Sequence, residues 1–192
     1  VRAECGVNSH IHIMTIMIGR GDIYSDDHVT LSGDGARFDA DAAYLGKNSQ
    51  TIDYNIVADH FGKKTESLIT VNGALTDSAK KVFRGTIDFK KGSADSVGSE
   101  NETVLMLGDD VVNKTVPLIL CAEENVEGTH GATIGELDAD TMFYFESRGI
   151  DRETAEKIMA YAAVERLIHM AEDSEFAAVA EKAMGIKTDT EE

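Results

Sequence analysis

The sequence predicts a mainly β region followed by a small α-helical domain, on three observations. Sixteen of the 17 glycines lie in residues 1–149, and only Gly185 lies beyond them. The first part is rich in short apolar runs separated by Gly, Asn and Asp, as expected of strands joined by turns. After Gly135 the apolar residues take up helical spacing instead. We therefore expect a β-rich region over residues 1–135 and a helical domain over residues 136–192.

Several apolar runs of strand length lie in the first two thirds of the chain. They cover residues 11–18, 28–31, 67–71, 81–83, 85–89, 103–107 and 116–121. No segment of helical period separates them, so βαβ units are not expected. The pattern fits a sandwich, a barrel or a β-solenoid, and periodicity alone does not choose among these. The Gly, Asn, Asp and Ser between the runs suit the corners of solenoid coils.

Three helices are expected after the strands. Asp138 is placed to cap a short helix that Gly149 ends, and Asp151 to cap a second, longer helix. Ser174 is the expected cap of a third helix, which ends at Gly185. The second helix carries one apolar stripe. Its members are Ala160, Ala163, Val164, Leu167, Ile168 and Ala171.

Composition and charge exclude several classes of protein. Hydrophobic residues make up 42% of the 192 residues, enough for a packed core, and the net charge is −17. Residues 1–122 carry 12 Lys and Arg against 17 Asp and Glu, whereas residues 123–192 carry 6 against 18. A polyanionic nucleic acid is therefore not an expected partner. No apolar run reaches 18 residues, so no membrane span is expected.

The cysteines indicate the cellular compartment, and the first residue indicates that the sequence is part of a longer protein. Cys5 and Cys121 do not make a disulfide framework, so a reducing cytoplasmic compartment is expected. The chain begins with Val1 rather than Met, and we therefore expect it to be part of a longer protein.

The main candidate for chemistry is His130, in the sequence HGATIG at residues 130–135. Its neighbours Gly128 and Gly131 predict a tight turn that leaves the imidazole accessible. Imidazole is a good ligand for iron, zinc or copper, although a histidine hydrogen-bonded within a turn explains the same motif. Cys121 lies nine residues earlier, where it fits a small buried hydrophobe as well as a ligand. Together with Glu127 of the expected loop, these groups could form a mixed iron site.

Several signatures of self-contained chemistry are absent. There is no P-loop, no G-x-G-x-x-G, no C-x-x-C pair and no G-x-S-x-G. The chain therefore shows no means of binding ATP or of completing an iron–sulfur cluster with its own cysteines, and an enzymatic activity is not expected. If it handles clusters, it must use non-cysteine ligands or share ligands with another subunit.

Two stretches of the chain resemble a known family. Residues 67–89, SLITVNGALTDSAKKVFRGTIDF, and residues 117–148, with HGATIG and FYFESRG, are similar to SufB and SufD of the SUF iron–sulfur cluster assembly system. The HGAT form is the more SufD-like one. The resemblance implies a right-handed parallel β-helix over residues 1–135 and a C-terminal helical domain over residues 136–192.

The resemblance also implies a function, that of a scaffold subunit that holds a cluster only transiently. Family members pair through their β-helix ends, as SufB–SufD heterodimers or homodimers, and bind the ABC-type ATPase SufC through the helical domain. His130 matches the SufD histidine of the proposed assembly site, and Glu102 stands near the position of an essential SufB cysteine. Cys121 or a SufB-type partner would then supply the thiolate, with Glu102 and Glu127 as weaker candidate metal ligands. The expected partner-binding residues are Phe143, Tyr144, Arg148, Ile158 and Tyr161.

Two other interpretations address the same patterns. An oligomerising β-solenoid with no direct metal role has the same patterns, and metal loading would separate it from the scaffold. A β-helix enzyme acting on carbohydrate is disfavoured, because Trp is absent and aromatic residues are only 6% of the chain.

Overall fold

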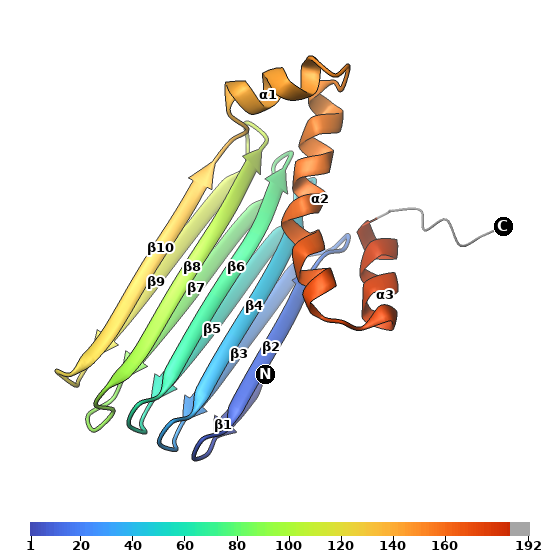
Figure 1. The fold of residues 1–192 in the computed structure, drawn as a ribbon. Helices are drawn as coiled ribbons and strands as arrows, with labels where there is room; N and C mark the ends of the chain where they lie inside the picture. The colour runs from blue at the N-terminus through green and yellow to red at the C-terminus, as the bar shows by residue number, and fades with distance from the viewer. Residues whose placement is uncertain (185–192) are drawn as a thin grey trace.

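A computed structural model describes residues 1–184 and shows a two-sided parallel β-solenoid with three helices at one side (Figure 1). The strands are β1 (Arg2–Cys5), β2 (His10–Met17), β3 (Ile23–Leu31), β4 (Arg37–Gly46), β5 (Thr51–His60), β6 (Glu66–Thr76), β7 (Lys80–Phe89), β8 (Ser96–Leu107), β9 (Val112–Cys121) and β10 (Val126–Gly135). Odd-numbered strands form one sheet and even-numbered strands the other, each in chain order and parallel throughout. The prediction of a parallel β-helix is confirmed.

Each coil of the solenoid contributes one strand to each sheet. The coil length is nearly constant: 29 residues separate Phe38 from its β6 partner Ser67, and 31 separate Ser67 from its β8 partner Gly98. Polar residues with left-handed backbone recur at the corners, such as Asn48 (φ 55°) and Asp77 (φ 57°). The backbone N–H of Asn48 donates to Asp77 Oδ2 at 2.7 Å, which ties one corner to the next.

The strand prediction was wrong in two respects. The strands β1, β4 and β5 were not among the predicted runs; in β4 and β5, Asp and Asn alternate with the apolar residues. The HGATIG sequence lies within strand β10 and is not a turn. Gly128, two residues before this sequence in β10, is needed for another reason, because a Cβ there would lie 2.6 Å from the side chain of Ile119.

Alternate side chains of every inner strand fill the space between the sheets. The largest of these include Phe38, Tyr44, Tyr54, Phe83 and Phe89, each at most 2% exposed. His60 is also fully buried, and it contacts the hydroxyls of Thr65 (2.7 Å) and Ser67 (2.9 Å). Burial lowers the pKa of His60 to about 4, so the ring is neutral near pH 7.

The helices begin close to where the sequence predicts. They are α1 (Ala139–Glu146), α2 (Arg152–Met170) and α3 (Ser174–Met184). Asp138 and Asp151 cap the first two, each accepting a hydrogen bond from the backbone N–H three residues on, at 2.7 and 2.8 Å. The third cap was misassigned: Asp173 Oδ1 accepts the N–H of Phe176 at 3.0 Å, and Ser174 is already helical. The expected stop at Gly185 lies outside the described residues.

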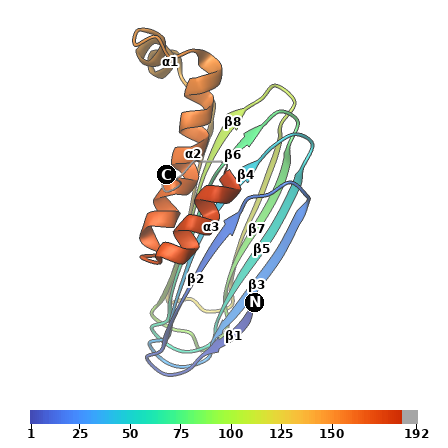
Figure 2. The ribbon, with the colours of Figure 1, turned by 90° about the vertical axis from the view of Figure 1, so that its right-hand side faces the viewer.

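Helix α2 lies along the outer face of the even-numbered sheet, over β2, β4 and β6, with α3 beside it (Figure 2). A second apolar core forms there, between Ala43, Leu45 and Ala74 of the sheet and the α2 stripe. The second half of β4, residues 42–46, is therefore buried on both faces. None of the helices in residues 1–184 is long and apolar enough to cross a membrane.

The close packing of the coils predicts that Gly73→Ala is destabilising. Gly73 pairs with Tyr44, and an added Cβ would lie 2.5 Å from the buried Tyr44 ring. We expect a loss of about 1–3 kcal/mol in the free energy of unfolding, measured by urea titration. Gly135→Ala is the matched control, since nothing lies within 4 Å of its added Cβ. Equal stability of the two variants would contradict this packing.

Candidate functional site at the open end of the solenoid

The last coil of the solenoid is uncovered. The strands β9 and β10 each pair on one side only, with β7 and β8, and so leave two edges of ten residues each. Residues that face inward in deeper coils are partly or largely exposed here, among them Pro117 and Ile134 (46% exposed). Helix α2 lies over β2, β4 and β6, away from this end (Figure 1). We refer to this surface, formed by β9 and β10, as the open end.

A group of polar side chains lies inside the solenoid just below the open end. We call it the inner polar cluster; its members are Lys81, Glu100, Glu102, Thr115 and His130. Strand alternation and register point all five inward. The group is unusual because charged side chains are almost never buried without partners.

The deeper half of this cluster is a buried ion pair. Lys81 Nζ contacts Glu102 Oε1, and the two side chains are 1% and 0% exposed. Thr115 donates to Glu102 Oε2 at 2.5 Å. Burial lowers the pKa of Lys81, and the negative charge of Glu102 opposes that effect. Both oxygens of Glu102 are thus engaged within the chain.

Glu100 lacks such partners. The residue is 1% exposed, and its carboxylate occupies the space left by Gly85, where a Cβ would lie 1.8 Å from Oε2. Oε1 lies 3.3 Å from His130 Nδ1, but no aligned hydrogen bond to Oε1 is found within residues 1–184. Burial, and then the charge of Glu102, raise the pKa of Glu100 to about 7, while Lys81 opposes the rise.

His130 joins the cluster to the open end. It lies directly beside Glu100 in the β8–β10 register, on the last strand of the sheet. Its side chain is 27% exposed, against 2% for Glu100. The imidazole therefore has one side against the buried carboxylate and another toward solvent, which suits a ligand or a proton-transfer group.

Of the other residues predicted to bind metal, Glu102 lies in the inner polar cluster with His130, but Cys121 and Glu127 are not brought together with it. Cys121 faces inward on β9, but Gly128 lies opposite Ile119, which places His130 opposite Pro117. Four residues of strand, about 13 Å, then separate Cys121 from that position. Glu127 lies in strand β10, not in a loop, and alternation places it on the outer face. Within the described part of the chain no group of three or more His, Cys, Asp or Glu is arranged to hold a metal ion.

Lys81 and Glu100 were missed by the sequence analysis. The signal for them is the alternation in β8, where Ser96, Gly98, Glu100, Glu102 and Val104 face one side. The other side of β8 is also polar, so the sequence does not reveal which set is buried.

The residues predicted to bind a partner are mostly exposed. Phe143 and Tyr144 of α1 are 72% and 53% exposed, and the Arg148 guanidinium stacks 3.9 Å from the Tyr144 ring. Ile158 of α2 is 43% exposed. Tyr161 differs, because it is half-buried and its hydroxyl donates to the Met184 carbonyl at 3.0 Å. The first four therefore form an accessible surface on α1, the turn after it and α2.

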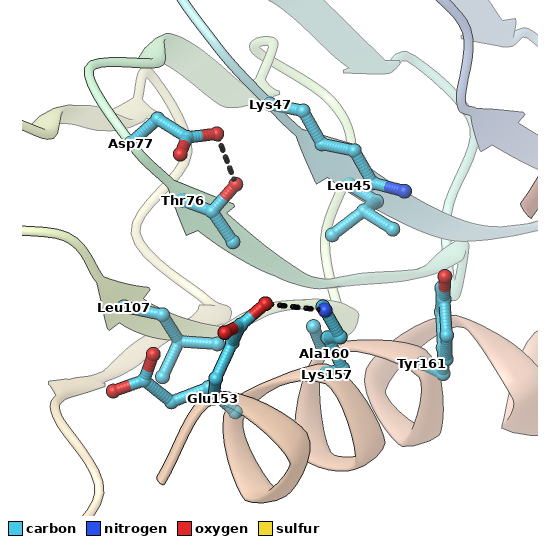
Figure 3. A pocket seen from close by; sticks show the side chains of 10 residues that line it. Leu45, Lys47, Thr76, Asp77, Leu107, Glu153, Lys157, Ala160 and Tyr161 are labelled. Atoms are coloured by element: carbon cyan, nitrogen blue, oxygen red, sulfur yellow. Dashed lines mark hydrogen bonds and ion pairs between the residues drawn. The ribbon is translucent and has the colours of Figure 1, made fainter.

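A cavity of about 360 Å³ separates α2 from the ends of β4, β6 and β8 (Figure 3). Its apolar lining comes from Leu45, Leu107 and Ala160. The charged groups at its rim are engaged within the chain: Asp77 accepts from Thr76 at 2.9 Å, and Glu153 pairs with Lys157 at 2.6 Å. Because the buried Glu100 carboxylate lies just below the open end, beside the accessible His130, we take the open end as the candidate site.

The fold defines a parallel β-solenoid that ends in an uncovered pair of strands. Residues 1–163 match the family model described as SUF system FeS cluster assembly, SufBD core domain. The chain belongs to this family.

Curated relatives agree with this assignment. The chain is 31% identical over 159 residues to the iron–sulfur cluster assembly protein SufD of Bacillus subtilis, covering 83% of this chain and 36% of the relative. It is 25% identical over 182 residues to a SufBD family protein of Synechocystis, covering 95% of this chain and 38% of the relative. A match to SufD of Escherichia coli has 30% identity over 88 residues, 46% of this chain and 21% of that protein. The chain thus spans little more than a third of the first two relatives.

The environment of Glu100 predicts a pH dependence of stability that Glu100→Gln removes. The carboxyl pKa rises from 4.5 to about 7 on folding. The folded chain then keeps the proton longer than the unfolded chain, so stability falls as pH rises between about 5 and 8. The rise corresponds to a loss of about 3 kcal/mol.

Urea unfolding of both proteins across this range measures the effect. The difference between wild type and Glu100→Gln cancels the opposite contribution of His60, which both proteins contain. A difference that does not change with pH would contradict the assigned environment.

Proposed function

We propose that the chain is a non-enzymatic scaffold subunit of the SUF assembly complex in the cytoplasm. It pairs through its open end, carries an iron–sulfur cluster transiently as cargo, and binds an ABC-type ATPase through its C-terminal helices. The observation that carries this proposal is the position of His130, at the uncovered end of the solenoid and against a buried carboxylate. Membership of the SufBD family supports the same role.

Pairing with a second subunit is expected because β9 and β10 each have one unpaired edge. Unpaired strands of this length are templates for another chain, and an apolar inward face favours covering them. A second copy related by a two-fold axis perpendicular to the solenoid axis brings its last strands antiparallel to β9 and β10. Both sheets then continue across the junction with full backbone hydrogen bonding. A SufB-type partner with the same fold meets the same geometry, so the partner is either that protein or a second copy.

Cluster binding requires ligands from two subunits. His130 is the accessible ligand of this chain, while Glu102 is engaged by Lys81 and Glu127 faces outward. Cys121 is free and exposed, but it lies too far along the strands to share an ion with His130 of the same chain. We therefore assign thiolates to the partner, or to Cys121 of a second copy, with His130 completing the site from this side.

The ATPase is assigned to the accessible surface of the helices. Exposed aromatic residues with an adjacent arginine, here Phe143, Tyr144 and Arg148, are typical of protein interfaces. This surface lies on α1, beyond the end of β10 (Figure 1), so both contacts are compatible in one complex.

A structural solenoid that only oligomerises is the alternative. It uses the same open end but gives no reason for a buried carboxylate beside His130. The two candidate functions differ in whether the binding of iron by the complex depends on His130.

The pairing surface predicts that Ile134→Lys prevents association. Ile134 is 46% exposed in the single chain, so the lysine costs little there, but in a pair it would bury an unmatched charge. Such a charge costs about 3–5 kcal/mol, a weakening of at least about 100-fold. Sedimentation velocity, alone and with a SufB-type partner, measures the change. Thr133→Lys, on the outer face of the same strand, is the control that should still pair, and unchanged pairing of Ile134→Lys would place the interface elsewhere.

The proposed cluster-binding role predicts that the amount of iron bound depends on His130. We expect His130→Ala to lose most of the iron and visible absorption after anaerobic reconstitution with a SufB-type partner, because it removes a ligand. Cys121→Ala should reduce loading only in samples without that partner. Binding of the ATPase, measured in parallel, should be unaffected and shows that the variants are folded. Full loading of His130→Ala would leave the structural solenoid as the better account.

A further inference from the structure

We propose that Glu100 is a positioning residue for His130: it holds the Nδ1 side of the ring inside the solenoid, so that Nε2 is unprotonated and directed to the open end. The proposal rests on the function proposed above and names the residue that would prepare its ligand. Glu100 itself touches neither the cargo nor the partner.

The geometry of the contact supports this assignment. Oε1 of Glu100 lies 3.3 Å from Nδ1 of His130, and the two residues are direct neighbours in parallel strands. The ring nitrogens point in different directions, so a ring whose Nδ1 faces Glu100 turns Nε2 away from the solenoid interior. The distance is within reach of a hydrogen bond, and the proposal is that the Nδ1–H donates to this carboxylate. A hydrogen bond at one ring nitrogen decides which nitrogen remains free to bind a metal.

The carboxylate has no structural role that explains its position. Glu102, two residues on, is matched by Lys81 and Thr115, whereas Oε1 of Glu100 has no aligned hydrogen bond within residues 1–184. The carboxylate occupies space that is free because residue 85 is glycine. This position therefore contributes no side chain to the core. A buried acid without partners destabilises a fold, and an apolar residue of similar length would serve packing better.

The surroundings leave His130 as the group that Glu100 can act on. The charged groups of the inner polar cluster that face it are Lys81 from β7, Glu102 from β8 and His130 from β10. Lys81 is engaged by Glu102, and Glu102 carries the same charge as Glu100. His130 is the cluster member that combines a donor with exposure to the open end.

The test compares Glu100→Met, which keeps the length but removes the acceptor, with Glu127→Gln, which removes a carboxylate from the outer face of β10. The first measurement is the ring ¹⁵N chemical shifts of His130 at mildly alkaline pH, assigned with His130→Ala. We expect an Nδ1–H tautomer in wild type and Glu127→Gln, and a shift toward Nε2–H in Glu100→Met. Thermal unfolding should show Glu100→Met to be at least as stable as wild type.

The second measurement is the affinity for Co²⁺, used alone as a spectroscopic substitute for Fe²⁺. Removing a carboxylate that orients a ligating histidine weakens metal binding about 10- to 100-fold, and we expect this for Glu100→Met but not for Glu127→Gln. An unchanged tautomer and affinity in Glu100→Met, with binding lost in His130→Ala, would overturn the positioning role alone. A changed tautomer with Co²⁺ binding unaffected in His130→Ala would support the positioning of the ring and overturn the metal role of the open end.

Discussion

The stacking of parallel coils is the constraint on which this structure depends. Each coil satisfies its backbone hydrogen bonds only through the coils before and after it, so the first and last coils are always incomplete. At the C-terminal side the chain leaves the solenoid after Gly135 and packs its helices on the outer face of one sheet. Two edges of ten residues therefore stay unpaired, and a surface for a partner is a consequence of the architecture.

The same stacking explains how polar groups come to lie at that surface. Side chains in register form rows that run from coil to coil through the interior, and most of these rows are apolar. Two neighbouring rows change at β8, where Glu100 follows Ile69 and Glu102 follows Val71. The Glu100 row ends at His130 on β10. Glu100 is buried one strand below the open end, and His130, above it in the same row, is the side chain that a partner can reach. Site and interface are thus one feature of the fold.

Local sequence patterns could predict a β-rich region followed by helices, whereas the choice of a β-solenoid came from the family resemblance, and only part of the site was predicted. Separated apolar runs, glycine distribution and helix caps such as Asp138 and Asp151 are local signals, and these led to the correct order of strands and helices. The Glu100–His130 contact joins residues 30 positions apart through a register that no local pattern fixes. The glycines beside His130, Gly128 and Gly131, indicated a turn because glycine is common in turns. At Gly128 the actual reason is the facing side chain of Ile119.

The most direct test is pulsed electron paramagnetic resonance on the reduced cluster, reconstituted on this chain with its partner and with ¹⁴N or ¹⁵N histidine in this chain only. The account predicts a nitrogen coupling of the strength expected for a metal-bound imidazole, which changes with the isotope and is absent in His130→Ala. A bound cluster with no histidine nitrogen coupling from this chain would contradict the claim that the open end supplies His130 to the cargo.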